Sequence, residues 1–191
     1  AGAFSDCSSL ESITIPEGVT HLGGEVFSGC SSLSSITIPE SVDCLFPNAF
    51  EGCSSLKNIV IPGSVKGIYD RAFADCSSLE SITLSEGLEW IGSEAFAGCS
   101  SLSGITIPNS VERLLGTPFT GCNITSIFLP ENVFLTSASG YSSGETLSAM
   151  NNLENIEVAE TNRYYCSIDG VLFSKDKGTL VAYPQNKKGN E

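Results

Sequence analysis

A ten-residue pattern recurs five times in this chain, and successive copies begin 23 residues apart. The first copy reads CSSLESITIP, and the five copies start at Cys7, Cys30, Cys53, Cys76 and Cys99. The same spacing reaches Cys122, which begins a sixth and shorter unit. A repeat of fixed period constrains the fold more than any other feature, because each copy becomes one structural unit that stacks on its neighbours.

The hydrophobic pattern inside each unit predicts a short strand. Ile13 and Ile15 alternate with Ser12 and Thr14, and the later units repeat this alternation. Alternate residues of a strand point to the same side, so the Ile pair faces inward and the Ser/Thr pair faces outward. Pro16 follows and ends the pairing, because it has no N–H to donate. One coil leaves its apolar row open, whereas coils stacked about 4.8 Å apart cover it.

We therefore predict a mainly β solenoid of 23-residue coils, with a parallel sheet on one face and short irregular or 3-10 returns. Residues 1–158 are assigned to about seven units of this solenoid. The seventh unit places Met150 at the cysteine position and is preceded by extra residues, which predict a loop insertion at 134–146. Residues 159–191 are expected to continue the solenoid as a β-hairpin, with strands at 170–173 and 179–183 and a turn at 175–178. We expect this last segment to be truncated.

The recurring cysteines are interpreted as buried free thiols. Each lies between an apolar Phe and an apolar Leu, and Met150 replaces the thiol in the seventh unit, which is typical of a position that needs a buried hydrophobe. Parallel side-chain directions disfavour a disulfide, and the chain has no CxxC pair that would indicate zinc. The predicted structural ladder consists of Cys7, Cys30, Cys53, Cys76, Cys99 and Cys122.

The pattern AFxGCSSLxSITIPxSVxxIG resembles the BspA-like, Treponema pallidum-type leucine-rich repeat. The likeness is close over residues 1–133 and looser over 147–158, and the segment from Asn162 to Pro184 is similar to one common in the same family. The resemblance implies a leucine-rich-repeat solenoid in an extracellular or cell-surface protein. It further implies protein recognition or adhesion without catalysis, but it does not give the ligand. We expect an unknown protein ligand, and the candidates are host extracellular-matrix and host cell-surface proteins.

Composition excludes several other functions. The net charge of −13 argues against nucleic acid and against anionic lipid surfaces, because binders of both carry basic patches. The chain has no apolar run of membrane-spanning length, so we expect no membrane insertion. His21 is the only histidine and lies at a variable position, which leaves no base for a nucleophilic triad. We expect no enzyme activity, no cofactor and no metal.

The outward row of the predicted strands is the candidate partner-binding surface. Its polar members also suit a β-sheet surface, because Thr is a good strand former. Val60 and Phe128 break the row, and Phe128 is close in sequence to the insertion, so we hypothesise a local site made by Phe128, Tyr141 and residues 134–146. The candidate residues are Ser12, Thr14, Ser35, Thr37, Asn58, Val60, Ser81, Thr83, Thr106, Phe128 and Tyr141.

Three interpretations of function stay open at this point. A protein-binding or adhesion module is favoured, and a structural spacer that presents another domain is the alternative suggested by the uniform Ser/Thr row. A carbohydrate-binding surface would need clustered aromatic and polar groups. Phe46, Tyr69 and Trp90 on the return side are either anchors of a second surface or caps over coil corners. Because the first unit has no polar cap, we also expect further repeats or end-to-end self-association.

Overall fold

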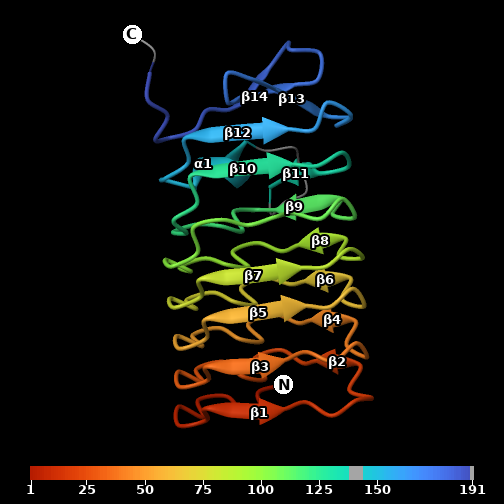
Figure 1. Cartoon of the computed structure of the whole chain (residues 1–191), viewed down its shortest axis with the longest axis vertical. Coiled ribbons are helices and arrows are strands. Elements are labelled where there is room, and N and C mark those ends of the chain that lie inside the picture. The colour runs from red at the N-terminus through yellow and green to blue at the C-terminus, as the bar shows by residue number, and fades with distance from the viewer. Residues whose placement is uncertain (138–143, 190–191) are drawn as a thin grey trace.

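The computed structural model describes residues 1–137 and 144–189, and in it the chain winds into a single stack of coils (Figure 1). Successive coils lie one above the other, with the N-terminus in the lowest coil and the C-terminal strands at the opposite end. The predicted fold class is therefore confirmed: a mainly β solenoid of 23-residue coils with parallel strand pairing. The described residues contain one helix, the four-residue α1 (Glu145–Ser148).

One side of the stack, here called the strand face, carries the strands that the repeat predicts. They are β1 (Ser12–Thr14), β3 (Ser35–Thr37), β5 (Asn58–Ile61), β7 (Ser81–Leu84), β10 (Ser126–Leu129) and β12 (Asn155–Val158). They form three parallel pairs, β1 with β3, β5 with β7 and β10 with β12. In β5 and β7 the register joins Ile59 to Ile82 and Val60 to Thr83, so equivalent positions of successive units lie side by side.

The opposite side, here called the return face, is more regular than the sequence indicated. Its strands are β2 (His21–Leu22), β4 (Cys44–Leu45), β6 (Gly67–Ile68), β8 (Trp90–Ile91), β9 (Arg113–Leu115) and β11 (Phe134–Thr136). They form a parallel six-stranded sheet in the order β11-β9-β8-β6-β4-β2. Residues such as Leu45, Ile68, Ile91 and Leu114 are fully buried in it, so each short return strand adds an inward apolar side chain to the core.

The fifth coil departs from the predicted pattern. Residues 104–107 form no strand, although their sequence GITI matches the strand positions of the other units. Gly104 replaces the Ser or Asn that begins the strand elsewhere, and glycine in a strand interior weakens it. In the first five units the next apolar residue follows the cysteine by three positions, whereas in the sixth unit Ile124 follows Cys122 by two. This shorter turn shifts the sixth coil relative to residues 104–107. Ile107 is nevertheless 5% exposed, so the inward packing is kept without the strand pairing.

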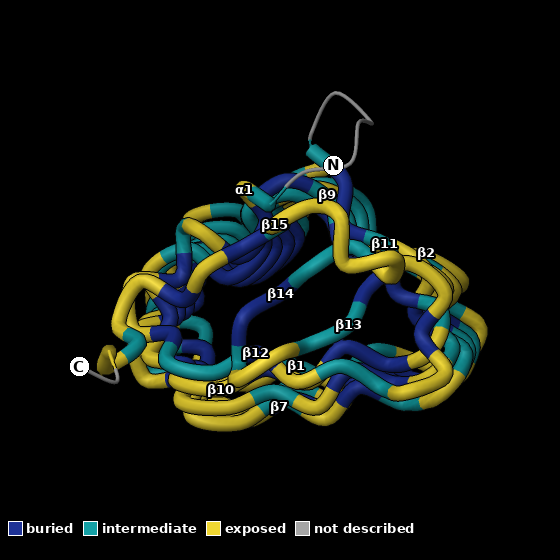
Figure 2. The backbone as a smooth tube through the Cα atoms, turned by 90° about the horizontal axis from the view of Figure 1, so that it is seen from above, coloured by how far each residue is buried: buried dark blue, intermediate teal, exposed yellow. Residues whose placement is uncertain are grey.

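The C-terminal segment covers the end of the core. The strands β13 (Tyr165–Ile168), β14 (Val171–Ser174) and β15 (Leu180–Ala182) form an antiparallel three-stranded sheet. Strands β14 and β15 correspond to the expected hairpin, whereas β13 was not predicted. Seen along the stack, β13 and β14 cross over the interior (Figure 2). Tyr165 and Leu172 are buried there, so this sheet closes the apolar interior.

The expected loop at 134–146 is only partly correct. Residues 134–136 form β11, the sixth strand of the return face, and residues 145–148 form α1. The pairing of Phe134 with Arg113 extends the return sheet by one more strand before the chain leaves it. Tyr141 lies outside the described residues.

Two ladders of side chains run along the core. The buried rings of Phe27, Phe50, Phe73, Phe96 and Phe119 form one ladder. Phe73 stacks on Phe50 at 5.1 Å between ring centroids and on Phe96 at 5.4 Å. In the second ladder each buried thiol donates to the backbone carbonyl of a Phe one coil earlier, as in Cys76 Sγ to Phe50 O at 3.2 Å. The cysteine therefore fills volume, as expected, and also satisfies its S–H donor.

The burial of each ladder thiol depends on the position of its coil in the stack. The five buried members of the thiol ladder are Cys30, Cys53, Cys76, Cys99 and Cys122. The prediction of a buried position is wrong for Cys7, which is exposed because its coil has a neighbour on one side only. Burial raises the pKa of the thiols of Cys53 and Cys122 to about 12. A thiol that stays protonated is a poor nucleophile, because the thiolate is the reactive form.

This arrangement predicts which thiols react in the folded protein. We expect iodoacetamide at pH 8 to label Cys7 within minutes, to label the half-buried Cys44 and Cys166 more slowly, and to leave the five ladder thiols unlabelled until the chain is denatured. Mass spectrometry of peptides from native and denatured samples measures this pattern. Labelling of Cys76 as fast as Cys7 in native protein would contradict the buried ladder.

Candidate functional site

The strand face presents most of the sequence-predicted site residues to solvent. Its outward side chains are exposed in every coil, and they lie together along one side of the stack that includes β1, β7 and β10 (Figure 2). The hydroxyl of Ser81 donates a hydrogen bond to Asn58 Oδ1 of the neighbouring coil at 2.6 Å. The structure places ten predicted residues on this face: Ser12, Thr14, Ser35, Thr37, Asn58, Val60, Ser81, Thr83, Thr106 and Phe128.

Two apolar side chains interrupt this polar row. Val60 is 58% exposed and Phe128 is 48% exposed, so neither contributes fully to the core. Val60 lines a groove of about 650 Å³ that β3, β5 and β7 form together with the Pro39 and Pro62 turns. Thr37, Asn58 and Thr83 lie in the same groove and supply hydrogen-bonding groups around the apolar side chain. An apolar centre with a polar rim is the usual composition of a protein-binding patch.

Phe128 and the described ends of the insertion lie on different faces of the solenoid, and the hypothesis of a local site with Tyr141 stays a prediction, because Tyr141 lies outside the described residues. Phe128 lies on β10 of the strand face, opposite Glu157 of β12. The residues that enter the insertion belong to β11, which lies in the sheet of the return face on the far side of the coil (Figure 2). The two are six residues apart in sequence, yet the chain turns round the edge of the solenoid between them. Phe128 is exposed, and the described ends of the insertion do not lie beside it.

The return-side aromatic residues form one continuous row of rings. The ring of His21 meets that of Phe46 edge-on at 5.9 Å, and Phe46 stacks on Tyr69 at 5.3 Å. Tyr69 meets Trp90 edge-on at 5.8 Å. The indole of Trp90 lies over Gly67, where a Cβ atom would come within 2.1 Å of it. The rings are therefore packed on one another and on the sheet, as one row along the return face.

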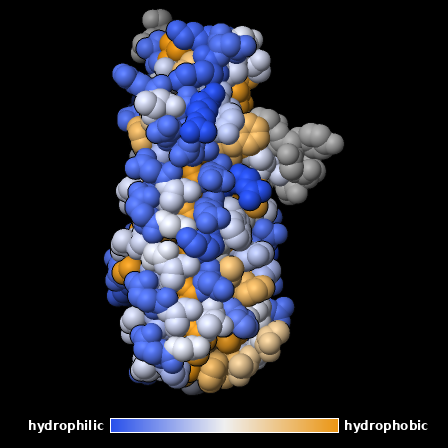
Figure 3. All heavy atoms as spheres, turned by 90° about the vertical axis from the view of Figure 1, so that its right-hand side faces the viewer, coloured by the Kyte–Doolittle hydropathy of each residue, from blue (hydrophilic) through white to orange (hydrophobic). Residues whose placement is uncertain are grey.

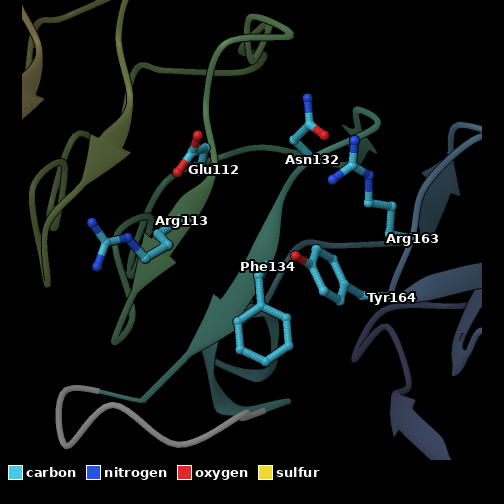
Figure 4. A pocket seen from close by; sticks show the side chains of 6 residues that line it. All are labelled: Glu112, Arg113, Asn132, Phe134, Arg163 and Tyr164. Carbon is cyan, nitrogen blue, oxygen red and sulfur yellow. The ribbon is translucent and has the colours of Figure 1, made fainter.

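A cleft on the return face gathers residues that the sequence did not single out. Glu112, Arg113, Asn132, Phe134, Arg163 and Tyr164 line a cavity of about 430 Å³ (Figure 4). They come from β9 and the residue before it, from the turn before β11, from β11 itself and from the segment before β13. No motif joins these positions, because the solenoid brings them together from segments about 20 and 30 residues apart.

Apolar surface also gathers at the end of the stack formed by the first coil (Figure 3). Phe4, Ile13, Ile15, Val19 and Val26 line a cavity of about 300 Å³ there. Phe4 is 36% exposed, whereas its equivalents in the middle coils are fully buried. End-to-end association through this surface stays a prediction.

The described residues offer no arrangement for catalysis of the common hydrolytic type. The exposed His21 ring has its Nδ1 atom 3.1 Å from Thr20 Oγ1, and in the described part of the chain no carboxylate forms a hydrogen bond that would orient the ring. Across residues 1–137 and 144–189, no group of three or more His, Cys, Asp and Glu side chains is placed to hold a metal ion. The helix of this part of the chain is too short to cross a membrane.

Comparison with known proteins agrees with this architecture. The chain matches the BspA type leucine rich repeat region in six copies, over residues 1–86 and 66–182. A leucine-rich repeat protein from Eubacterium ventriosum superposes with a TM-score of 0.74 and 22% identity, covering 92% of this chain and 45% of that protein. A leucine rich cell surface protein from Faecalibacterium prausnitzii gives a TM-score of 0.65 and 27% identity, covering 94% and 56%.

The pneumococcal vaccine antigen PcpA is similar to the same degree. Its TM-score is 0.65 at 27% identity, and the match covers 94% of this chain and 48% of that one. The chain thus spans about half the length of these solved structures. A search of curated proteins finds no match.

Proposed function

Since the chain belongs to the BspA-type leucine-rich repeat family, we propose that it is an extracellular or cell-surface adhesion module that binds a protein partner through the strand face. The repeat fold of such surface-type proteins suggests a protein-interaction module, and the family is generally non-catalytic. Two similar structures are described as a cell surface protein and as a vaccine antigen, and these descriptions support the proposed location. The proposed partner is a host extracellular-matrix or host cell-surface protein.

The single observation that carries the proposal is the exposure of Val60 and Phe128 on an otherwise hydroxyl-rich face. In most other units Thr stands at the same position, and Thr satisfies the strand without exposing a large apolar side chain. The fold therefore does not require Val60 or Phe128. Exposed apolar and aromatic side chains inside a polar surface are where binding energy concentrates in protein interfaces.

Restoring the repeat residue tests this proposal. We expect Phe128→Thr to weaken binding to the recognised extracellular-matrix protein by roughly 30-fold, because a central aromatic anchor contributes about 2 kcal/mol or more. Val60→Thr should weaken binding less, because it removes a smaller apolar contact. Surface plasmon resonance against purified extracellular-matrix proteins measures both effects.

Tyr183→Thr is the matched control, because Tyr183 is 53% exposed but lies outside the strand face. It should leave the affinity unchanged. Equal loss with Tyr183→Thr and Phe128→Thr would contradict the strand-face site. Failure of folded protein to bind any matrix or cell-surface protein would favour the spacer alternative instead.

A further inference from the structure

The three arginines of this acidic chain differ sharply in their surroundings. Arg71 is enclosed by carboxylates, with Nη2 2.6 Å from Glu51 Oε1 and Nη1 2.5 Å from Glu94 Oε2. Arg113 and Arg163 form no ion pair within the described part of the chain, although the chain carries 22 acidic residues. Both of them line the cleft on the return face, here called the arginine cleft. Two guanidinium groups are thus left without an internal anion at one place.

Two aromatic side chains, Phe134 and Tyr164, form one wall of the arginine cleft. Phe134 lies beside Arg113 in adjacent strands, and its ring centroid is 4.8 Å from that of Tyr164. Figure 4 shows the Tyr164 ring turned toward Phe134, with Arg163 and Asn132 on the same side of the cleft. A second hollow of about 460 Å³ shares Phe134, Arg163 and Tyr164 and adds Lys175. Arg163 therefore lies between two hollows that share one aromatic wall.

The carboxylates near the cleft do not neutralise it. Asp176 is held within its own turn, where it accepts from Ser174 Oγ at 2.5 Å and from the Gly178 N–H at 3.0 Å. Glu112 lines the cleft and has no cation within ion-pair distance among the described residues. Among the side chains that line the arginine cleft itself, two guanidinium groups therefore stand against one carboxylate, on a chain whose net charge is −13.

The aromatic wall is fixed by a buried side chain. The Oδ1 atom of Asn162, which is 0% exposed, accepts from the backbone N–H groups of Tyr164 and Tyr165 at 2.8 Å each. Its Nδ2 donates to Pro130 O at 2.6 Å, which ties this segment to the turn before β11. The buried Tyr165 hydroxyl accepts from the Leu135 N–H at 3.2 Å. A wall held in this way loses little conformational entropy when a ligand binds.

We propose that the arginine cleft binds an acidic saccharide, that is, a sugar that bears a carboxylate. A guanidinium group matches a carboxylate with two parallel hydrogen bonds, and Arg163 supplies that contact from its position between the two hollows. The C–H face of the pyranose ring lies on Phe134 and Tyr164, because the negative face of an aromatic ring attracts electron-poor hydrogens. Asn132 bonds sugar hydroxyls, and Arg113 adds positive potential from the neighbouring strand.

The lining of the cleft favours a saccharide over a protein partner. Its volume of about 430 Å³ lies within the range of small-ligand sites, and its polar groups lie around the aromatic wall. The strand-face groove presents one apolar side chain among hydroxyl and amide groups, which suits a protein surface. The arginine cleft lies on the opposite face, so this binding activity is independent of the proposed protein contact.

Sialyllactose and lactose form a matched pair of probes, because they differ by the acidic sugar. We expect titration of the full chain, followed by NMR of the sugar and by calorimetry, to show binding of sialyllactose and binding of lactose that is at least about tenfold weaker. Arg163→Ala should weaken sialyllactose binding by about tenfold or more, and Arg113→Ala by less. Arg163→Lys should give an intermediate affinity, because it keeps the charge and loses the paired hydrogen bonds.

Lys66→Ala is the matched control, since it removes one cation beside the same sheet, at a residue paired with Glu89. It should leave sialyllactose binding unchanged, and thermal unfolding should show that all variants are folded. Equal affinity for lactose and sialyllactose, or no binding of either sugar, would overturn the proposal. Binding of an acidic peptide with no binding of the sugar would overturn the saccharide assignment, while Phe128→Thr would still report separately on the strand face.

Discussion

Replacing Phe73 with alanine is expected to lower the free energy of unfolding by about 3–5 kcal/mol. The Phe73 ring is fully buried and stacks between Phe50 and Phe96 at nearly parallel angles of 1° and 4°. Loss of the ring removes apolar contacts to two neighbouring coils at once and leaves a cavity in a closely packed core. Urea unfolding followed by circular dichroism measures the change.

Phe4→Ala provides the comparison at the same repeat position. Phe4 is 36% exposed and stacks on one ring only, that of Phe27 at 5.4 Å. We expect less than half of the loss seen for Phe73→Ala. Similar losses in the two variants would contradict the view that the stability of each coil depends on contacts to both neighbours.

Alkaline pH is expected to unfold this protein steeply. Burial raises the pKa of Cys53 and Cys122 from 9.0 to about 12, and it also raises the pKa of Cys30, Cys76 and Cys99. In the unfolded chain these thiols lose protons near pH 9, whereas in the folded chain they keep them. The unfolded state therefore binds fewer protons between pH 9 and about 12, and stability falls through that window.

The size of this effect follows from the number of thiols. Each buried thiol contributes up to about 1.4 kcal/mol of lost stability per pH unit, and the ladder has five of them. Because a domain is stable by only about 5–15 kcal/mol, we expect unfolding before pH 12 is reached. Below about pH 8 the ladder should make almost no contribution to the pH dependence, because the thiols are then protonated in both states.

A pair of alanine variants separates the ladder from other groups that titrate at high pH. Cys76→Ala removes one buried thiol, and Cys7→Ala removes an exposed thiol at the equivalent repeat position. Urea unfolding at several pH values should show a shallower decline of stability above pH 9 for Cys76→Ala than for the parent chain, and an unchanged decline for Cys7→Ala. An identical decline in all three proteins would show that the ladder does not control alkaline stability.

Much of the fold could be predicted from the sequence because every copy of the repeat contains the same alternation of apolar and polar residues. The alternation of Ile13 and Ile15 with Ser12 and Thr14 defines which side of the strand faces inward, and each copy confirms it. The return sheet was missed because its strands in most coils are only two residues long. Two residues carry no detectable alternation, and the pairing of Leu45 with Ile68 depends on the stacking distance that the other face imposes.

The sites were less readable, because they depend on which segments meet in space. Exposure of Val60 and Phe128 followed directly from the strand pattern. The described ends of the insertion lie on the other face from Phe128, because six residues are enough to turn the chain from one face to the other. Arg113, Phe134 and Arg163 line the arginine cleft from three different segments of the chain. No local sequence pattern predicts that these segments lie side by side.

Hydrogen–deuterium exchange of the full chain, with and without a bound extracellular-matrix protein, tests the central claim most directly. The account predicts slower exchange in β5, β7 and β10, around Val60 and Phe128, and unchanged exchange in β6, β8 and β9 of the return face. Protection confined to the return strands, or no protection anywhere in folded protein that binds the partner, would contradict recognition through the strand face.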